Sequence, residues 1–247
     1  MKKQLSWEFR LGLSLLAVTV LLNGLHYAIF RDLRHIFLWG LTSLAFLPMS
    51  VLFVSLIIER LLNAREASAR LEKTNMLIGT FFGAAGRQLL EYFAQWDAEP
   101  FDMRTDVSRA EDWSRAVHLR VRERMAHHAC RVDMKKANLA ELKAFLQTRS
   151  DLLLRLLENP LLLEHAAFAE ALRAIFHLAD ELSARRTLDN VAPADLEHLS
   201  GDLRRAYGAL ALQWVDHMDY LQRNYPYLFS LAIRMNPFNP EASPEVG

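Results

Sequence analysis

Two long apolar stretches near the beginning of the chain dominate its hydrophobic pattern. Residues 11–30 contain no acidic or basic side chain apart from one histidine, and residues 36–58 contain none at all. Each stretch, wound as a helix, is long enough to cross the roughly 30 Å hydrocarbon core of a bilayer. The pattern therefore predicts a transmembrane helical hairpin over residues 1–58, with spans at about 11–30 and 36–58.

The charged segment "RDLRH", residues 31–35, separates the two stretches. The cost of burying its charges in hydrocarbon makes it the predicted turn of the hairpin. Lys2 and Lys3 followed by an apolar run also resemble a secretory signal. However, no small-residue cleavage site follows cleanly and a second apolar stretch comes at once, so an uncleaved hairpin is expected.

Lysine and arginine residues near the spans predict the orientation. Three precede the first span, two lie in the turn and four follow the second span: Lys2, Lys3 and Arg10; Arg31 and Arg34; Arg60, Arg65, Arg70 and Lys73. The more basic sides are expected to face the cytoplasm. The prediction is a multi-pass protein of the cell inner (cytoplasmic) membrane with both termini cytoplasmic. A single cysteine, Cys130, excludes an intramolecular disulfide and fits a reducing compartment.

A repeat of 3.5 residues runs from the second span into the polar sequence that follows. We define the seam as these positions: Gly40, Ser43, Leu47, Ser50, Val54, Ile57, Leu61, Leu71, Asn75, Ile78, Phe82 and Leu89. Such a repeat is typical of a helix that faces a partner in a left-handed coiled coil. It predicts a cytoplasmic helical stalk over residues 59–100 and a homo-oligomer. The alternative is that the same stripe packs on the chain's own bundle.

The stretch "GTFFGAAGR", residues 79–87, superficially resembles a phosphate-binding loop. It lacks the Gly-Lys-Ser/Thr ending and the preceding strand that such a loop requires. The glycines are better explained by a close helix approach or a local break in the helix.

The remaining chain predicts a helical bundle over residues 101–235 and a flexible tail over 236–247. Capping boxes at Ser108/Glu111 and Asn138/Glu141 start helices that end near His128 and Asn159. Prolines start the others: Pro160 to about Arg186, Pro193 to about Asn224, and a short one from Pro226. Apolar residues recur every three or four positions and no run alternates convincingly, so the fold class is all-α.

A basic patch follows the connector around Pro100. It consists of Arg115, Arg120, Arg122, Arg124, Arg131, Lys135 and Lys136. Near a bilayer it would suit anionic lipid headgroups or a phosphorylated ligand. Because 29 basic residues balance 29 acidic ones, neutralisation by the acidic segments at residues 164–181 and 216–219 is preferred, and nucleic acid is not expected as a partner.

Histidines and carboxylates on the predicted helices raise the question of a metal centre in the bundle. His177, Asp180 and Glu181 share a helix face, and further candidates lie on other helices: Glu164, Glu170, His198, Asp202, Asp216 and His217. The paired Glu-x-x-His motifs of di-metal bundles are missing. Solvated helix faces and interhelical ion pairs explain these residues, so no metal is expected.

Nucleophilic and zinc sites are not supported either. His127, His128 and Cys130 lack the paired ligand spacing of a tetrahedral zinc site. Cys130 with a histidine, and Ser200 with His198, lack a nucleophile elbow or a third member. Neither a catalytic constellation nor a cofactor is predicted.

Two long stretches carry a family resemblance. They are "LAFLPMSVLFVSLIIERLLNAREASARLEKTNMLIGTFF" and "HLSGDLRRAYGALALQWVDHMDYLQRNYPYLFSLAIRMNPF". The chain resembles a family of uncharacterised bacterial and archaeal proteins with two membrane spans. The resemblance implies the architecture of a two-span anchor with a cytoplasmic helical domain, and it implies no activity or ligand.

Two functional classes remain after these exclusions. The preferred one is a non-enzymatic membrane-anchored scaffold or signal transducer, whose helical bundle binds a cytoplasmic protein partner. The alternative is an oligomeric ion channel with a pore lined by the second span, although that span has no filter sequence or ring of charge. A bundle metalloenzyme ranks below both.

Overall fold

The computed structural model describes residues 7–103, 113–189 and 191–245. Regular secondary structure in these residues is helical, and the only β-type pairing among them is an isolated antiparallel bridge between Asp97 and Val132. The predicted all-α class is confirmed. The chain forms two compact units, residues 1–67 and residues 68–247.

The first unit contains α1 (Trp7–Phe30) and the first part of α2 (Leu33–Phe81). Only Arg31 and Asp32 lie between the two helices, so the turn is shorter than the predicted segment 31–35. Arg31 adopts a left-handed backbone conformation with φ of 53°, which reverses the chain. Asp32 Oδ1 accepts a hydrogen bond of 3.1 Å from the His35 backbone N–H and thereby caps α2.

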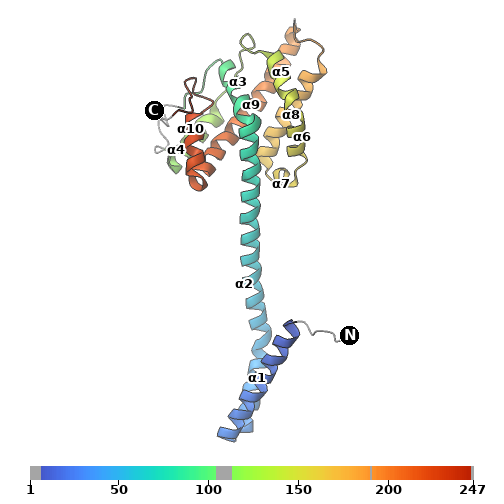
Figure 1. The fold of residues 1–247 in the computed structure, drawn as a ribbon, viewed down its shortest axis with the longest axis vertical. Helices are drawn as coiled ribbons and strands as arrows, with labels where there is room; N and C mark the ends of the chain where they lie inside the picture. Colours follow the sequence, from blue (N-terminus) through green and yellow to red (C-terminus); the bar gives the residue numbers. More distant parts are fainter. Residues whose placement is uncertain (1–6, 104–112, 190, 246–247) are drawn as a thin grey trace. The chain divides into compact units, whose positions relative to one another are not determined.

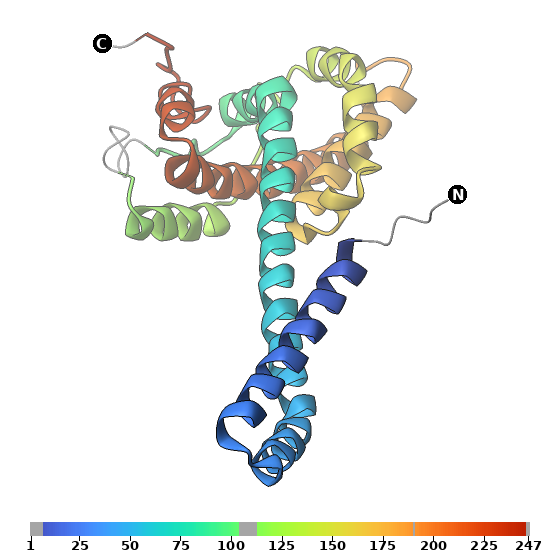
Figure 2. The ribbon, with the colours of Figure 1, turned by 60° about the horizontal axis from the view of Figure 1, so that its bottom comes forward.

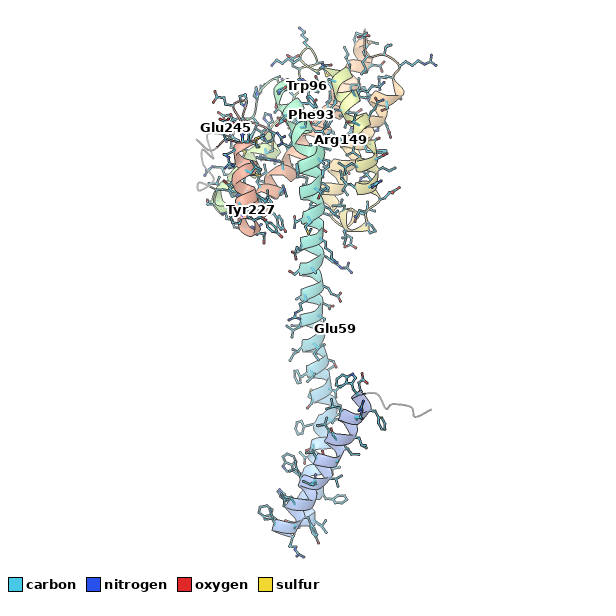
Figure 3. The ribbon with its side chains drawn as sticks, in the orientation of Figure 1. Glu59, Phe93, Trp96, Arg149, Tyr227 and Glu245 are labelled. Atoms are coloured by element: carbon cyan, nitrogen blue, oxygen red, sulfur yellow. The ribbon has the colours of Figure 1, made fainter. Side chains whose placement is uncertain are left out.

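Side chains of the first unit project outward from both helices (Figure 3). None of the residues of α1 is buried, and the large apolar residues of α2 before Ala67 are exposed except Ile36, which is half-buried. By length and composition, both helices are able to span a membrane.

The second unit begins within α2 and continues through a π-helical turn at Phe82–Gly86 (Figure 1). Its other helices are α3 (Arg87–Trp96), α4 (Arg115–His127), α5 (Leu139–Thr148), α6 (Ser150–Leu157), α7 (Pro160–Leu163), α8 (Ala166–Ala184), α9 (Pro193–Asn224) and α10 (Pro226–Arg234).

Helix α9 is the central element of the second unit. It packs against α4, α8 and α10, and apolar residues along its length, such as Leu203, Leu210 and Trp214, are buried. Figures 1 and 2 show α5 to α8 on one side of the C-terminal end of α2, with α4 and α10 on the other side. The hydrophobic core of this unit therefore joins helices that are far apart in the sequence.

The helix boundaries agree with the sequence where a cap or proline sets them. Both α9 and α10 begin at the predicted prolines, and Asn138 caps α5 by accepting a hydrogen bond from the Glu141 N–H at 3.2 Å. The predicted capping box at Ser108 and Glu111 lies outside the described residues, and Ser114 caps α4 instead.

Two predicted helices are interrupted in the structure. The helix expected from Asn138 to Asn159 breaks at Arg149 into α5 and α6. The helix expected from Pro160 breaks before α8, where the His165 side chain accepts a hydrogen bond of 3.2 Å from the Phe168 N–H. The side-chain cap at His165 offers the backbone an alternative to a continuous helix, whereas α6 begins after Arg149 without a side-chain cap.

The unit boundaries also differ from the predicted ones. The sequence predicts a separate stalk over residues 59–100, whereas residues from Ser68 onward group with the bundle. The first part of the predicted tail, which starts at residue 236, is anchored: Asn236 and Phe238 are buried, and the Phe238 ring packs edge-on against Trp214. Burial of the Phe238 ring in the core anchors this part of the chain.

Candidate functional site

An apolar pocket of about 690 Å³ lies in the second unit. Its walls come from the end of α2, the π-helical turn, the C-terminal half of α9 and α10. The lining is mainly apolar and aromatic and includes Met76, Phe82, Trp214, Met218, Leu228 and Leu231. The volume falls within the range of small-molecule sites, about 300–1,000 Å³.

The π-helical turn that borders this pocket contains two glycines. Gly83 lines the pocket, and a Cβ placed there would have nothing within 4 Å. A Cβ at Gly86 would lie 2.5 Å from Cε1 of Phe81, a fully buried side chain. The expectation that these glycines permit a close approach or a local break therefore fits the structure, and a π-helical turn of this kind often marks a functional site.

His217 is the most unusual polar residue of the pocket wall. Only 7% of its surface is exposed, and its ring stacks on that of Phe82. Its Nδ1 atom is buried without a hydrogen-bond partner among the described residues. Burial lowers the pKa of this imidazole to about 4, because the charged form loses its hydration. The side chain is therefore neutral near pH 7.

A second, more polar pocket of about 350 Å³ shares Asn75, His217 and Tyr220 with the apolar pocket. A cluster of polar contacts around Asp216 lies along it. Asp216 Oδ1 is 3.1 Å from Nε2 of His118 and 2.8 Å from Nε of Arg122. The site thus combines an apolar chamber with an adjacent polar one.

The predicted basic patch does not gather into a single unpaired surface. Arg122 pairs with Asp216, one of the acidic residues named as its neutralising partners, and Arg131 lies 3.9 Å from Glu99. Arg124 donates a hydrogen bond to the Asp102 carbonyl and lies over the Phe101 ring. Arg115 lines the polar pocket. Lys135 and Lys136 are exposed.

The seam is divided between two environments. Ile78, Phe82 and Leu89 are buried in the core of the second unit, as the alternative of packing on the chain's own bundle requires. The positions from Gly40 to Leu71 are exposed, with 61% of Leu71 accessible. Self-association through the seam stays a prediction, and only the exposed positions from Gly40 to Leu71 are free of contacts with the core of the second unit.

Cys130 lies in the core, where 3% of the residue is exposed. Burial, with a further contribution from the Asp97 carboxylate, raises the pKa of its thiol to about 12. The thiol is therefore protonated at neutral pH, which does not favour a nucleophilic role. His128, a neighbour in sequence, instead places Nε2 at 2.6 Å from Oδ2 of Asp97.

The histidines and carboxylates considered for a metal centre separate into groups. Glu164 lies 3.5 Å from Arg70 and Glu170 lies 3.0 Å from Arg173, both as exposed pairs. His217 and Asp216 belong to the pockets. His177, His198 and Asp202 come together at one place between α8 and α9.

Sequence reasoning missed the apolar pocket. One feature of the sequence could have indicated it, namely the short apolar segment after Pro226. The side chains of Tyr227, Leu228 and Leu231 in this segment remain exposed in the structure. Figure 3 labels Tyr227 at the outer surface of α10. Periodicity alone does not distinguish the wall of a pocket from an ordinary core face.

Comparison with known proteins agrees with the division into two units. Residues 2–62 match the family model described as "MJ1433, N-terminal helical domain", and residues 70–234 match "Uncharacterized protein MJ1433, C-terminal helical domain". The chain is 40% identical over 229 residues to "Uncharacterized protein MJ1433" of Methanocaldococcus jannaschii, covering 93% of this chain and 92% of that protein. No solved structure matches the chain. The chain belongs to the MJ1433 family, with an N-terminal and a C-terminal helical domain.

Proposed function

We propose that this protein is a non-enzymatic, membrane-anchored signal transducer that self-associates. In this proposal α1 and the first part of α2 cross the cytoplasmic membrane twice, with both termini in the cytoplasm. The second unit receives an apolar small molecule in the pocket beside His217. The occupancy of that pocket is the signal that reaches the membrane segment.

The observation that carries the proposal is the continuity of α2. One helix, α2, contains the uncharged segment 36–58, with Pro48 inside it, and the residues Met76 and Gly79, which line the pocket. A ligand that changes the position of this helix end acts on the same element that holds the second apolar segment. An allosteric device needs two sites and an element that both of them bias.

The anchor is supported by the exposed apolar surface of the first unit. Its large apolar side chains, among them Leu21, Phe46 and Ile57, are mostly exposed among the residues that the structure describes. Moving each such side chain out of water stabilises the protein by about 1.5–3 kcal/mol, so a bilayer is the environment that suits them. Self-association is supported by the small and apolar seam positions in the same exposed region.

Cysteine labelling in intact cells tests the anchor and its orientation. In a Cys130→Ala background, a membrane-impermeant thiol reagent is expected to label Asp32→Cys from outside. It is expected to leave Glu72→Cys and Ser243→Cys unlabelled until the cells are permeabilised. External labelling of Ser243→Cys contradicts the orientation, and release of the protein by alkaline washing contradicts the anchor.

A reconstitution experiment addresses the channel alternative. The full chain in planar bilayers is expected to give no ion flux above that of protein-free bilayers. A reproducible conductance that bulky substitutions at Ser43 or Ser50 reduce would favour a pore lined by α2 over the transducer.

A further inference from the structure

A cluster of two histidines and one carboxylate lies away from both pockets, at the contact between α8 and α9. His198 and Asp202 are four residues apart on α9 and therefore share one face of that helix. His177 reaches the same place from α8, and one potential ligand atom of each residue lies within 4.8 Å of the others. The sequence analysis attributed these residues to solvated helix faces and interhelical ion pairs.

The geometry differs from that of ordinary hydrogen-bonded pairs. Nε2 of His177 lies 3.6 Å and Nε2 of His198 lies 3.4 Å from the same carboxylate oxygen, Oδ2 of Asp202. Both separations exceed the usual range for a hydrogen bond of about 2.7–3.2 Å. They match the spacing of about 3.4 Å between two ligand atoms that each lie about 2.1 Å from a tetrahedral zinc ion.

Asp202 is the buried member of the cluster. Only 3% of this residue is exposed, and Oδ2 has no hydrogen-bond partner among the described residues. Its other oxygen, Oδ1, lies 3.3 Å from Arg205, which orients the carboxylate. A buried carboxylate oxygen without a hydrogen bond is costly unless a cation occupies the position beside it.

Glu181 lies at the edge of this cluster. Its Oε1 atom is 3.9 Å from Nε2 of His198, and its Oε2 atom lies 2.6 Å from Arg185. Arg185 also lies 3.7 Å from the exposed Asp195. About half of the surface of each histidine side chain is exposed, so a hydrated ion has direct access from solvent.

We propose that His177, His198 and Asp202 form a surface binding site for a divalent transition-metal ion, with Zn²⁺ as the best fit. Glu181 or a water molecule completes the coordination. Two imidazoles and one carboxylate suit zinc or its neighbours in the first row and disfavour Mg²⁺ and Ca²⁺, which prefer oxygen ligands. The ion holds α8 against α9. This site is independent of the pocket and of the proposed function.

Zinc binding to the purified full chain in detergent, carrying an affinity tag without histidine, tests the proposal. Isothermal titration with ZnCl2 is expected to give one ion per chain, and MgCl2 at the same concentration is expected to give none. His177→Gln and His198→Gln are each expected to weaken zinc binding at least about tenfold. His127→Gln removes an exposed histidine on α4 and serves as the matched control, with unchanged affinity.

Thermal unfolding provides a second readout. Zn²⁺ is expected to raise the Tm of the wild-type chain and of His127→Gln, and to leave the Tm of His177→Gln and His198→Gln unchanged. Asp202→Asn keeps the shape of the buried side chain and is expected to abolish the zinc-dependent shift. The proposal is overturned if the wild type binds no stoichiometric zinc, or if both histidine variants bind it with wild-type affinity.

Discussion

The imidazole of His217 on α9 stacks on the phenyl ring of Phe82 in the π-helical turn, with ring centroids 5.1 Å apart and planes inclined by 15°. The contact joins the central helix to the segment that follows α2. It also keeps a titratable ring in an environment that disfavours its charge. Burial of this ring therefore makes the free energy of unfolding of the second unit depend on pH.

We expect His217 to destabilise the second unit in acid. Its pKa is about 4 in the folded chain and about 6.5 when exposed. Between these values the unfolded chain binds a proton that the folded chain does not, so stability falls as the pH is lowered from 6.5 to 4. Below pH 4 the free energy of unfolding is lower by about 3 kcal/mol in total.

Denaturant unfolding of residues 68–247 at pH 7.5 and pH 4.5 measures this contribution. His217→Phe keeps an aromatic ring on Phe82 and is expected to reduce the loss of stability between these two pH values by about 2.5 kcal/mol. His127→Phe, at an exposed histidine, should leave it unchanged. Equal acid sensitivity of wild type and His217→Phe would show that His217 does not cause the effect.

Filling the apolar pocket is expected to block ligand binding without unfolding the protein. Gly83→Leu adds a side chain to the pocket wall at a position with nothing within 4 Å. It should weaken binding of the fluorescent apolar dye 8-anilinonaphthalene-1-sulfonate to residues 68–247 about tenfold, or about 1.4 kcal/mol.

Gly201→Leu is the matched control for this experiment. Gly201 is also helical, with nothing within 4 Å of a Cβ, but it does not line the pocket. Its replacement should preserve dye affinity. An equal loss of affinity in both variants would mean that the dye binds elsewhere, and circular dichroism checks that both variants remain helical.

The two environments of the seam predict two different mutant phenotypes. Leu71 is exposed, so Leu71→Asp is expected to reduce the subunit number in mild detergent while the melting temperature of the second unit stays near the wild-type value. Ile78 is buried, with 4% of its surface exposed. Ile78→Asp should destabilise that unit by several kcal/mol, because it buries an unpaired carboxylate.

Native mass spectrometry and thermal unfolding of the full chain distinguish these effects. Glu66→Ala, at an exposed position outside the seam, should change neither quantity. An unchanged subunit number in Leu71→Asp would contradict self-association through the exposed seam.

The sequence by itself determined the elements whose signals are local. Pro193 and Pro226 set the first turns of α9 and α10, and Asn138 caps α5 through its neighbour Glu141. The two uncharged stretches and the charged segment between them predicted two helices joined by a turn, although the predicted turn over residues 31–35 is longer than the observed one at Arg31 and Asp32. These features depend on backbone sterics, on hydrogen bonds within one helical turn and on the length of an apolar run.

Only the tertiary structure decided which apolar and polar groups meet across the second unit. Leu71 and Ile78 occupy the same 3.5-residue repeat, yet one is exposed and the other is buried by helices that follow much later in the chain. The pocket beside Gly83 and the meeting of His177 with Asp202 likewise depend on how α8, α9 and α10 pack. Periodicity identifies the face of a helix that is apolar, but the surface that covers it is set by contacts between distant segments.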